Sequence, residues 1–168
     1  NIVQGVGLNQ ETLFGTEGTT QLATTGTLDE INRGAHEMAG IPYFVNGTQL
    51  YSLSDTFVLT TIGTITGTTR VSIADNGTQL MILVPGGSGY IYNHVTDVFA
   101  QITDVDFTAN GAPQFVVFID GYFLVTTDTK KFIVSAINNG LAYNALDFGT
   151  AESDPDDIVA PVVFKNQL

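Results

Sequence analysis

The sequence Asn46-Gly47-Thr48-Gln49-Leu50 occurs twice, because residues 76–80 repeat it letter for letter. An extended apolar run precedes each copy, at residues 43–45 and 71–74, and a strand-like segment follows each copy. Asn-Gly supplies the positive φ angles that tight hairpin turns require. Each copy therefore predicts a strand, a turn and a strand.

Two further copies follow the same pattern. Asp120-Gly121 separates two apolar runs at residues 115–119 and 122–125, and a last copy begins at residue 162 and ends at Leu168. Gly77 and Gly121 are 44 residues apart, and Asp120 and Asn166 are 46 apart. More strand candidates lie between the hairpins, at residues 89–92, 98–102 and 131–136. About four strands per forty-odd residues is typical of a β-propeller blade.

The interval from Gly47 to Gly77 is only 30 residues, so the repeat is irregular or one blade is short. A β-sandwich or jelly roll is the alternative, since it gives similar strands without a recurrent unit. The propeller interpretation predicts that certain side chains are buried between adjacent sheets: Phe44, Val71, Ile73, Phe115, Val117, Leu124 and Ile133.

Composition also indicates an all-β fold. The chain has 18 Gly, 11 Phe and 6 Tyr, with many Thr, Val and Ile, which suit pleated sheets and tight turns. The nearest candidate for a helical turn is residues 28–38, which Gly34 interrupts. No window supplies the period of a long helix.

A closed propeller has about four to eight blades. At the observed spacing, 168 residues hold fewer than four, and the last copy is cut where its second strand is due. We therefore expect residues 1–168 to be an incomplete propeller of about three blades plus the start of another, in the N-terminal part of a longer chain. Residues 1–32 are expected to form an arm or strands of the first blade.

Charge restricts the class of partner. Five Lys and Arg stand against 17 Asp and Glu, a formal net charge of -12. So few cations cannot neutralise a phosphate backbone, which argues against direct nucleic-acid binding. The absence of Cys excludes a disulfide framework, a thiolate zinc site and a cysteine nucleophile.

No catalytic, cofactor-binding or metal site is predicted. His36 and His94 are far apart and lack metal-like partners at i+2 or i+4, so they are interpreted as turn or interface histidines. The acidic stretch from Glu152 to Asp157 lacks the spaced carboxylates and central Gly of an EF-hand. It is interpreted as a solvated loop that contacts a neighbouring subunit.

Four other motifs have structural interpretations. The sequons at Asn46 and Asn76 fit hairpin chemistry, and the Gly-rich residues 85–89 fit a turn, because no helix follows them. Residues 72–77 partly match the Asp-box of sialidase propellers. A sialidase clamps a carboxylate with several arginines, and apart from Arg33 and Arg70 this chain has no Arg.

A set of segments in one order resembles the packaged-DNA stabilisation proteins of short-tailed bacteriophages. The set spans about 120 residues, and its motifs are Arg33-Gly34, residues 43–51, residues 67–77 with Arg70-Val71-Ser72, residues 104–107, residues 118–123, Asp128-Thr129 and residues 148–156. This resemblance implies a β-propeller in a tail hub, or nozzle, without catalytic residues.

The resemblance further implies a structural virion protein that closes the portal channel, helps to retain packaged DNA and anchors tail fibres and needle. Its implied partners are the portal adaptor (head-to-tail connector), tail needle and tailspike proteins, within a homohexamer. Its implied location is the virion tail, after assembly in the host cytoplasm. An acidic channel wall would leave DNA free to slide. The alternatives are a glycan-binding or glycan-cleaving, sialidase-like propeller and a generic protein-interaction propeller.

Overall fold

The computed structural model describes residues 2–4, 11–13, 18–25, 30–151 and 157–164. Residues 32–150 form three four-stranded antiparallel sheets, each with its strands adjacent in chain order. The strands of the first sheet are β3 (Asn32–Met38), β4 (Ile41–Asn46), β5 (Gln49–Leu53) and β6 (Leu59–Thr64). Those of the second are β7 (Ser72–Asp75), β8 (Gln79–Leu83), β9 (Gly89–Asn93) and β10 (Val98–Gln101). Those of the third are β11 (Pro113–Ile119), β12 (Tyr122–Thr127), β13 (Lys131–Ala136) and β14 (Asn139–Thr150).

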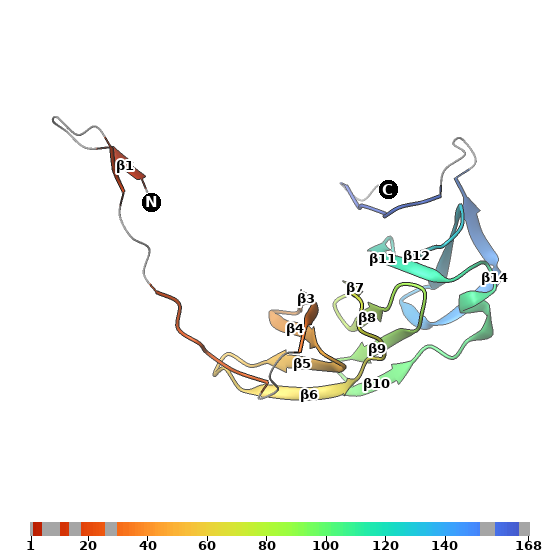
Figure 1. Cartoon of the computed structure of the whole chain (residues 1–168). Helices are drawn as coiled ribbons and strands as arrows, with labels where there is room; N and C mark the ends of the chain where they lie inside the picture. The colour runs from red at the N-terminus through yellow and green to blue at the C-terminus, as the bar shows by residue number, and fades with distance from the viewer. Residues whose placement is uncertain (1, 5–10, 14–17, 26–29, 152–156, 165–168) are drawn as a thin grey trace.

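The three sheets follow one another along an arc (Figure 1). The first strand of each sheet, β3, β7 or β11, lies on the concave side, and the last, β6, β10 or β14, lies on the convex side. This is the arrangement of propeller blades, and the arc is open over the described residues. The prediction of an all-β propeller fold is confirmed. A separate two-stranded sheet pairs β1 (Ile2–Gln4) with β2 (Glu11–Leu13).

Two apolar clusters hold neighbouring sheets together. In β8, Leu80 and Ile82 pack into the cluster with the first sheet, whereas Met81 and Leu83 pack into the cluster with the third. All four are fully buried, because successive residues of a strand face opposite sides and both sides are covered. Burying a side chain of this size stabilises the fold by about 1.5–3 kcal/mol. The middle sheet therefore ties the other two together.

The three predicted hairpin turns are confirmed. The last antiparallel residue pair before each turn is Asn46 with Gln49, Asp75 with Leu80, and Ile119 with Tyr122. The turns contain positive φ angles at glycine: 54° at Gly47, 82° at Gly77 and 89° at Gly121. Strands β9, β10 and β13 also lie where the sequence predicts them.

The phase of the predicted repeat is wrong for its first copy. The turn at Gly47 joins the second and third strands of its sheet, whereas the turns at Gly77 and Gly121 join first and second strands. The equivalent turn in the first sheet is at Ala39-Gly40. Gly40 lies 37 residues before Gly77, so the 30-residue interval compared two different positions in the blade.

The predicted core is partly right. Leu124 and Ile133 are buried, and four others are half-buried: Phe44, Val71, Ile73 and Val117. The predicted burial of Phe115 is wrong, because 36% of its surface is exposed. Its neighbour Val116 packs against the second sheet, so Phe115 lies on the opposite face of the third sheet, which no other described sheet covers.

Helical structure also differs from expectation. Residues 32–38 of the nearest helical candidate form β3, as the all-β prediction requires. A short 3₁₀ helix, η1 (Val105–Thr108), follows β10 and was not predicted. The Asp104 side chain caps it by accepting a hydrogen bond from the backbone N–H of Asp106. No helix among the described residues is long and apolar enough to cross a membrane.

Candidate functional site

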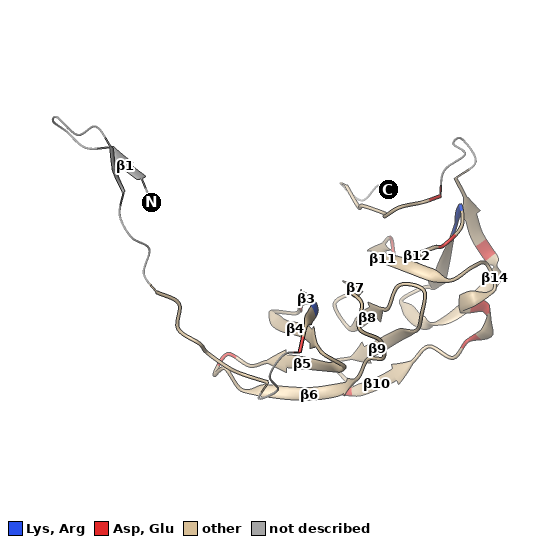
Figure 2. Cartoon of the chain, in the orientation of Figure 1, with Lys and Arg blue, Asp and Glu red and all other residues tan. Residues whose placement is uncertain are grey.

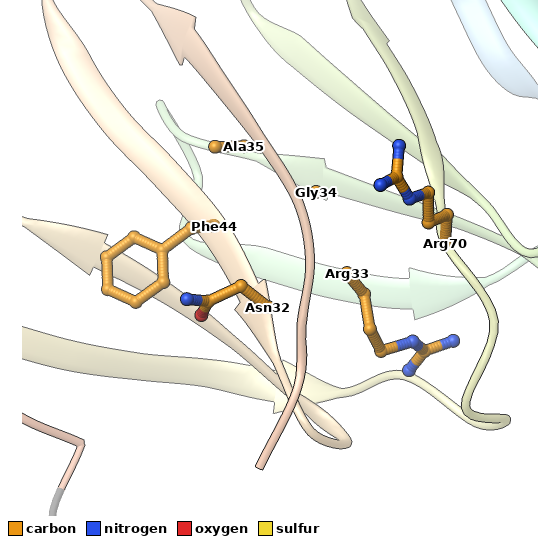
Figure 3. Close-up of a pocket in the computed structure, with 6 residues that line it drawn as sticks. All are labelled: Asn32, Arg33, Gly34, Ala35, Phe44 and Arg70. Carbon is orange, nitrogen blue, oxygen red and sulfur yellow. The ribbon is translucent and has the colours of Figure 1, made fainter.

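A shallow hollow lies where the first sheet meets the start of β7. It is lined by Asn32, Arg33, Gly34, Ala35, Phe44 and Arg70 (Figure 3). The guanidinium groups of Arg33 and Arg70 point away from each other. These two side chains therefore do not form a joint clamp for a substrate carboxylate.

Arg33 is bound by the protein's own backbone. Only 2% of its surface is exposed, and its guanidinium donates to four carbonyl oxygens of the turn after β4 and the segment after β6. Nε donates to Thr69 at 2.7 Å, Nη1 to Gly47 at 2.9 Å and Ile65 at 3.0 Å, and Nη2 to Thr66 at 2.7 Å. Burial lowers the pKa of Arg33 below its usual value. The geometry gives Arg33 a structural role.

The close approach of Val71 explains why a glycine follows Arg33. A Cβ at this position would meet Cγ2 of Val71 at 2.7 Å and the Val71 carbonyl oxygen at 3.2 Å. The close approach permits a backbone hydrogen bond of 3.0 Å from Val71 N–H to the Arg33 carbonyl. The Arg-Gly pair therefore joins the first strand of one sheet to the start of the next.

Arg70 is exposed, and its side chain makes no hydrogen bond or ion pair with any residue that the structure describes. It can meet an external anion. A single exposed arginine lacks the several guanidinium groups that the sialidase interpretation requires.

The two histidines have separate partners. His36 on β3 lies 2.6 Å from Asp75 on β7, measured from Nε2 to Oδ2, and so bridges two sheets. Asp75 Oδ1 also accepts a hydrogen bond from Gly77 N–H. His94 Nε2 lies 3.0 Å from the Gly77 carbonyl. Within the described ranges, no group of three or more His, Asp or Glu is placed to hold a metal ion.

The remaining motifs lie in turns. Residues 84–88 join β8 to β9, with Gly86 N–H donating to the Pro113 carbonyl of the third sheet at 2.7 Å. Asn46 is buried, so its sequon is closed to modification, and Asn76 accepts hydrogen bonds from two backbone N–H groups of its own turn. Residues 152–156 of the acidic stretch lie outside the described residues, and Asp157 is exposed.

Few acidic side chains lie on the concave strands of the described sheets. Of the strands on that side, β3 carries Glu37 and β7 carries Asp75, which pairs with His36, while β11 carries no acidic residue. The other acidic residues of the three sheets and their connections lie in turns, next to η1 or on β14 (Figure 2). The concave strands of the described sheets thus carry two acidic residues, and the acidic channel wall stays a prediction.

Two aspartates have defined electrostatic roles. Backbone N–H groups of Tyr143 and Asp106 donate to Asp104 and lower the pKa of its carboxyl. Burial, together with a 3.0 Å hydrogen bond from its hydroxyl to Asp97, raises the pKa of Tyr92 to about 12. Burial and the charge of Asp104 likewise raise the pKa of Tyr143. These contacts fasten η1 to β14 and the β9–β10 turn to the core.

Three sheets of four sequential antiparallel strands, joined along their inner edges, define a β-propeller fold. A model of the family described as Bacteriophage P22 Gp10, beta-propeller, matches residues 1–168, and the chain belongs to this family of phage DNA-stabilisation proteins. The resemblance noted in the sequence is confirmed. Comparison with curated proteins gives no match.

Solved structures share the fold. The Neurospora crassa Pan2 WD40 domain matches with a TM-score of 0.50 and 6% identity, over 71% of this chain and 36% of that one. A chain of a mitotic checkpoint complex matches with a TM-score of 0.44 and 9% identity, over 79% of this chain and 46% of that one. The chain thus spans less than half the length of these two solved structures.

The sequence singled out Arg33-Gly34 and Arg70-Val71-Ser72 through resemblance, without a physical role for either. The structure brings both segments to the boundary between the first and second sheets. Ser72 Oγ accepts a hydrogen bond from Val116 N–H at 3.1 Å at the next boundary, between the second and third sheets. Sequence reasoning missed the His36–Asp75 pair, because its members are 39 residues apart and no local spacing connects them.

Proposed function

We propose that this chain is part of a structural virion protein of a phage tail hub, which closes the portal channel, helps to retain packaged DNA and anchors the tail needle and fibres. The family match over residues 1–168 carries this proposal. The protein acts as a homohexamer at the tail, after assembly in the host cytoplasm. Its partners are the portal adaptor, the tail needle and the tailspike proteins.

The contacts between sheets support a mechanical role. The Arg33 carbonyl, the His36–Asp75 pair and Ser72 link the first strands of successive sheets along the concave edge. Such links resist separation of blades when a neighbouring ring or DNA under pressure loads the hub. This role needs no bond-making chemistry, cofactor or metal, and no sequence-specific contact to DNA.

We further propose that the three sheets are three blades of a larger propeller. Residues 157–164 then lead towards another blade, and the residues that precede β3, which begins at Asn32, act as an arm. The open face of the third sheet, which carries Phe115, is the surface that a further blade covers.

The proposal is tested in the phage that encodes the chain. Particles made without this gene product are compared with complete particles for the fraction of genome accessible to DNase and for tail composition by electron microscopy. We expect DNA-filled heads that leak and lack the hub. Particles that retain DNA and carry complete tails without the protein would refute the proposed function.

A further inference from the structure

The two ends of the sheets differ in surface chemistry. In an antiparallel sheet with sequential strands, the turn between the first and second strands lies at the same end as the turn between the third and fourth. We call this end the hairpin end; its turns are residues 39–40, 54–58, 76–78, 94–97, 120–121 and 137–138. Backbone hydrogen bonds join these turns in pairs, from His94 N–H to Thr78 at 3.1 Å and from Asn138 N–H to Gly121 at 2.7 Å.

In every sheet, the turn between the third and fourth strands carries an exposed apolar side chain. Phe57 is 47% exposed in the first sheet, Val95 is 69% exposed in the second and Ile137 is 64% exposed in the third. At the opposite end, the turns within sheets, residues 47–48, 84–88 and 128–130, present no exposed large apolar side chain, and the β10–β11 connection carries one, Val105. The apolar tips thus recur at one equivalent position in each of the three sheets.

The turn at Phe57 holds its side chain at a conformational cost. Phe57 has a φ of 62°, a region that bulky residues rarely adopt. Asp97 and Asn138 adopt similar angles in the equivalent turns, where short polar side chains tolerate them. Ser54 fixes the turn, because its carbonyl accepts from Phe57 N–H and its Oγ accepts from Val58 N–H. Since the Phe57 ring is exposed, core packing does not explain an aromatic residue here.

The two ends also differ in charge, because Asp104, Asp106 and Asp128 lie towards the opposite end together with the cations, whereas no Lys or Arg among the described residues lies at the hairpin end. Glu37, Asp55, Asp97 and Asp120 lie in or beside the turns of the hairpin end. The Lys and Arg residues that the structure describes all lie towards the other end: Arg33 and Arg70 near the starts of β3 and β7, and Lys130 and Lys131 in and after the β12–β13 turn. The hairpin end is therefore apolar at its tips and acidic around them.

We propose that the hairpin end docks onto a protein partner whose surface presents apolar pockets bordered by Lys and Arg. Phe57, Val95 and Ile137 fill the pockets, and the surrounding carboxylates meet the cations. Nucleic acid does not fit this surface, because the carboxylates repel phosphate. This inference goes beyond the proposed function, since it assigns a face and a partner chemistry that hold wherever in the virion the protein sits.

The first test compares two triple variants in phage that lack their own copy of the gene. One combines Phe57→Asn, Val95→Thr and Ile137→Thr. The control combines Val105→Thr, Leu146→Thr and Phe148→Thr, which also remove exposed apolar side chains but lie in the β10–β11 connection and the second half of β14, away from the hairpin end. Incorporation into purified particles is measured by mass spectrometry against the capsid protein.

We expect the first variant to be incorporated at least tenfold less and the control at the wild-type level. Urea midpoints of the purified chains separate docking from folding, because Asn suits the φ of residue 57 and should not lower the midpoint. Normal incorporation of the first variant, or equal loss in the control, overturns the proposal.

The second test identifies the partner chemistry. Benzoylphenylalanine is placed at residue 57, 95 or 137, and at residue 105 as the control, and particles are irradiated. We expect cross-linked partner peptides that combine apolar residues with Lys or Arg. We also expect the cross-linking yield to fall less steeply with added salt in the double variant Asp55→Asn/Asp97→Asn than in the wild type. Cross-links to acidic peptides, to DNA or to a second copy of this chain overturn it. A cross-linked basic partner from outside the tail overturns the proposed function and leaves this inference standing.

Discussion

Replacement of Arg33 by Met is expected to destabilise the chain strongly. Met keeps most of the apolar stem but removes every donor, so the carbonyls of Gly47, Ile65, Thr66 and Thr69 lose their shared partner. Leaving one buried acceptor unsatisfied costs about 1–3 kcal/mol. Water can reach some of these part-buried oxygens, and the folded state no longer desolvates a cation, which offsets part of the loss. We expect a net loss of about 3–5 kcal/mol, a large share of the roughly 5–15 kcal/mol that stabilises a typical domain.

The measurement is urea unfolding followed by circular dichroism at 25 °C, with the free energy of unfolding extrapolated to water. Arg70→Met is the matched control, because Arg70 lies across the same boundary between sheets, is exposed and has no hydrogen bond or ion pair among the described residues. We expect the control to change stability by less than about 0.5 kcal/mol. Arg33→Lys should recover only part of the loss, since an ammonium cannot direct donors in the planar fork of a guanidinium. A loss of less than about 1 kcal/mol in Arg33→Met, or an equal loss in Arg70→Met, would refute the structural role.

Three further predictions concern other contacts. Because the pKa of Asp104 is lowered in the folded state, its carboxylate stabilises the fold at pH values above the unfolded pKa of about 3.9, and this contribution is lost as the pH falls through the folded pKa. In a plot of unfolding free energy against pH, Asp104→Asn should therefore show a smaller loss of stability on the acid side. Absorbance at 295 nm should reveal a tyrosine that ionises near pH 12 and is absent in Tyr92→Phe; because the folded pKa is raised, its stabilisation is complete below about pH 10 and is lost above it. Gly63→Ala should cost about 1–3 kcal/mol in urea unfolding, since its Cβ would overlap the Phe99 ring, whereas Gly18→Ala, with nothing within 4 Å, should be neutral.

The hairpin turns were the part of the fold most accessible from sequence, because Asn-Gly and Asp-Gly determine a local backbone conformation. The turn at Ala39-Gly40 was missed, since Ala39 adopts a φ of 54° without being a typical turn residue. That omission caused the error of phase, because Asn46-Gly47 was then compared with a turn between different strands. The local sequence located the turns, whereas the pairing between strands was needed to decide which two strands of a sheet each turn joins.

Burial was harder to predict than turns, because alternation along a strand shows two faces without showing which one is covered. Phe44 and Phe115 lie on the outward faces of the first and third sheets, whereas Val45 and Val116 face the middle sheet. Both faces of β4 and of β11 carry apolar side chains, as expected for a blade between two others. Only the arrangement of the sheets decides that Phe115 is exposed here.

The candidate sites depended still more on topology. Arg33 is a plain basic residue in the sequence, and its four acceptors lie 14 to 36 residues further along the chain. Phe57, Val95 and Ile137 share no motif, and their equivalence follows only once the third and fourth strands of each sheet are known. The family match covers residues 1–168 and does not distinguish the roles of individual residues. The position of each residue in its blade decides whether it holds neighbouring blades together, as Arg33 does, or is available to a partner, as the three apolar tips are.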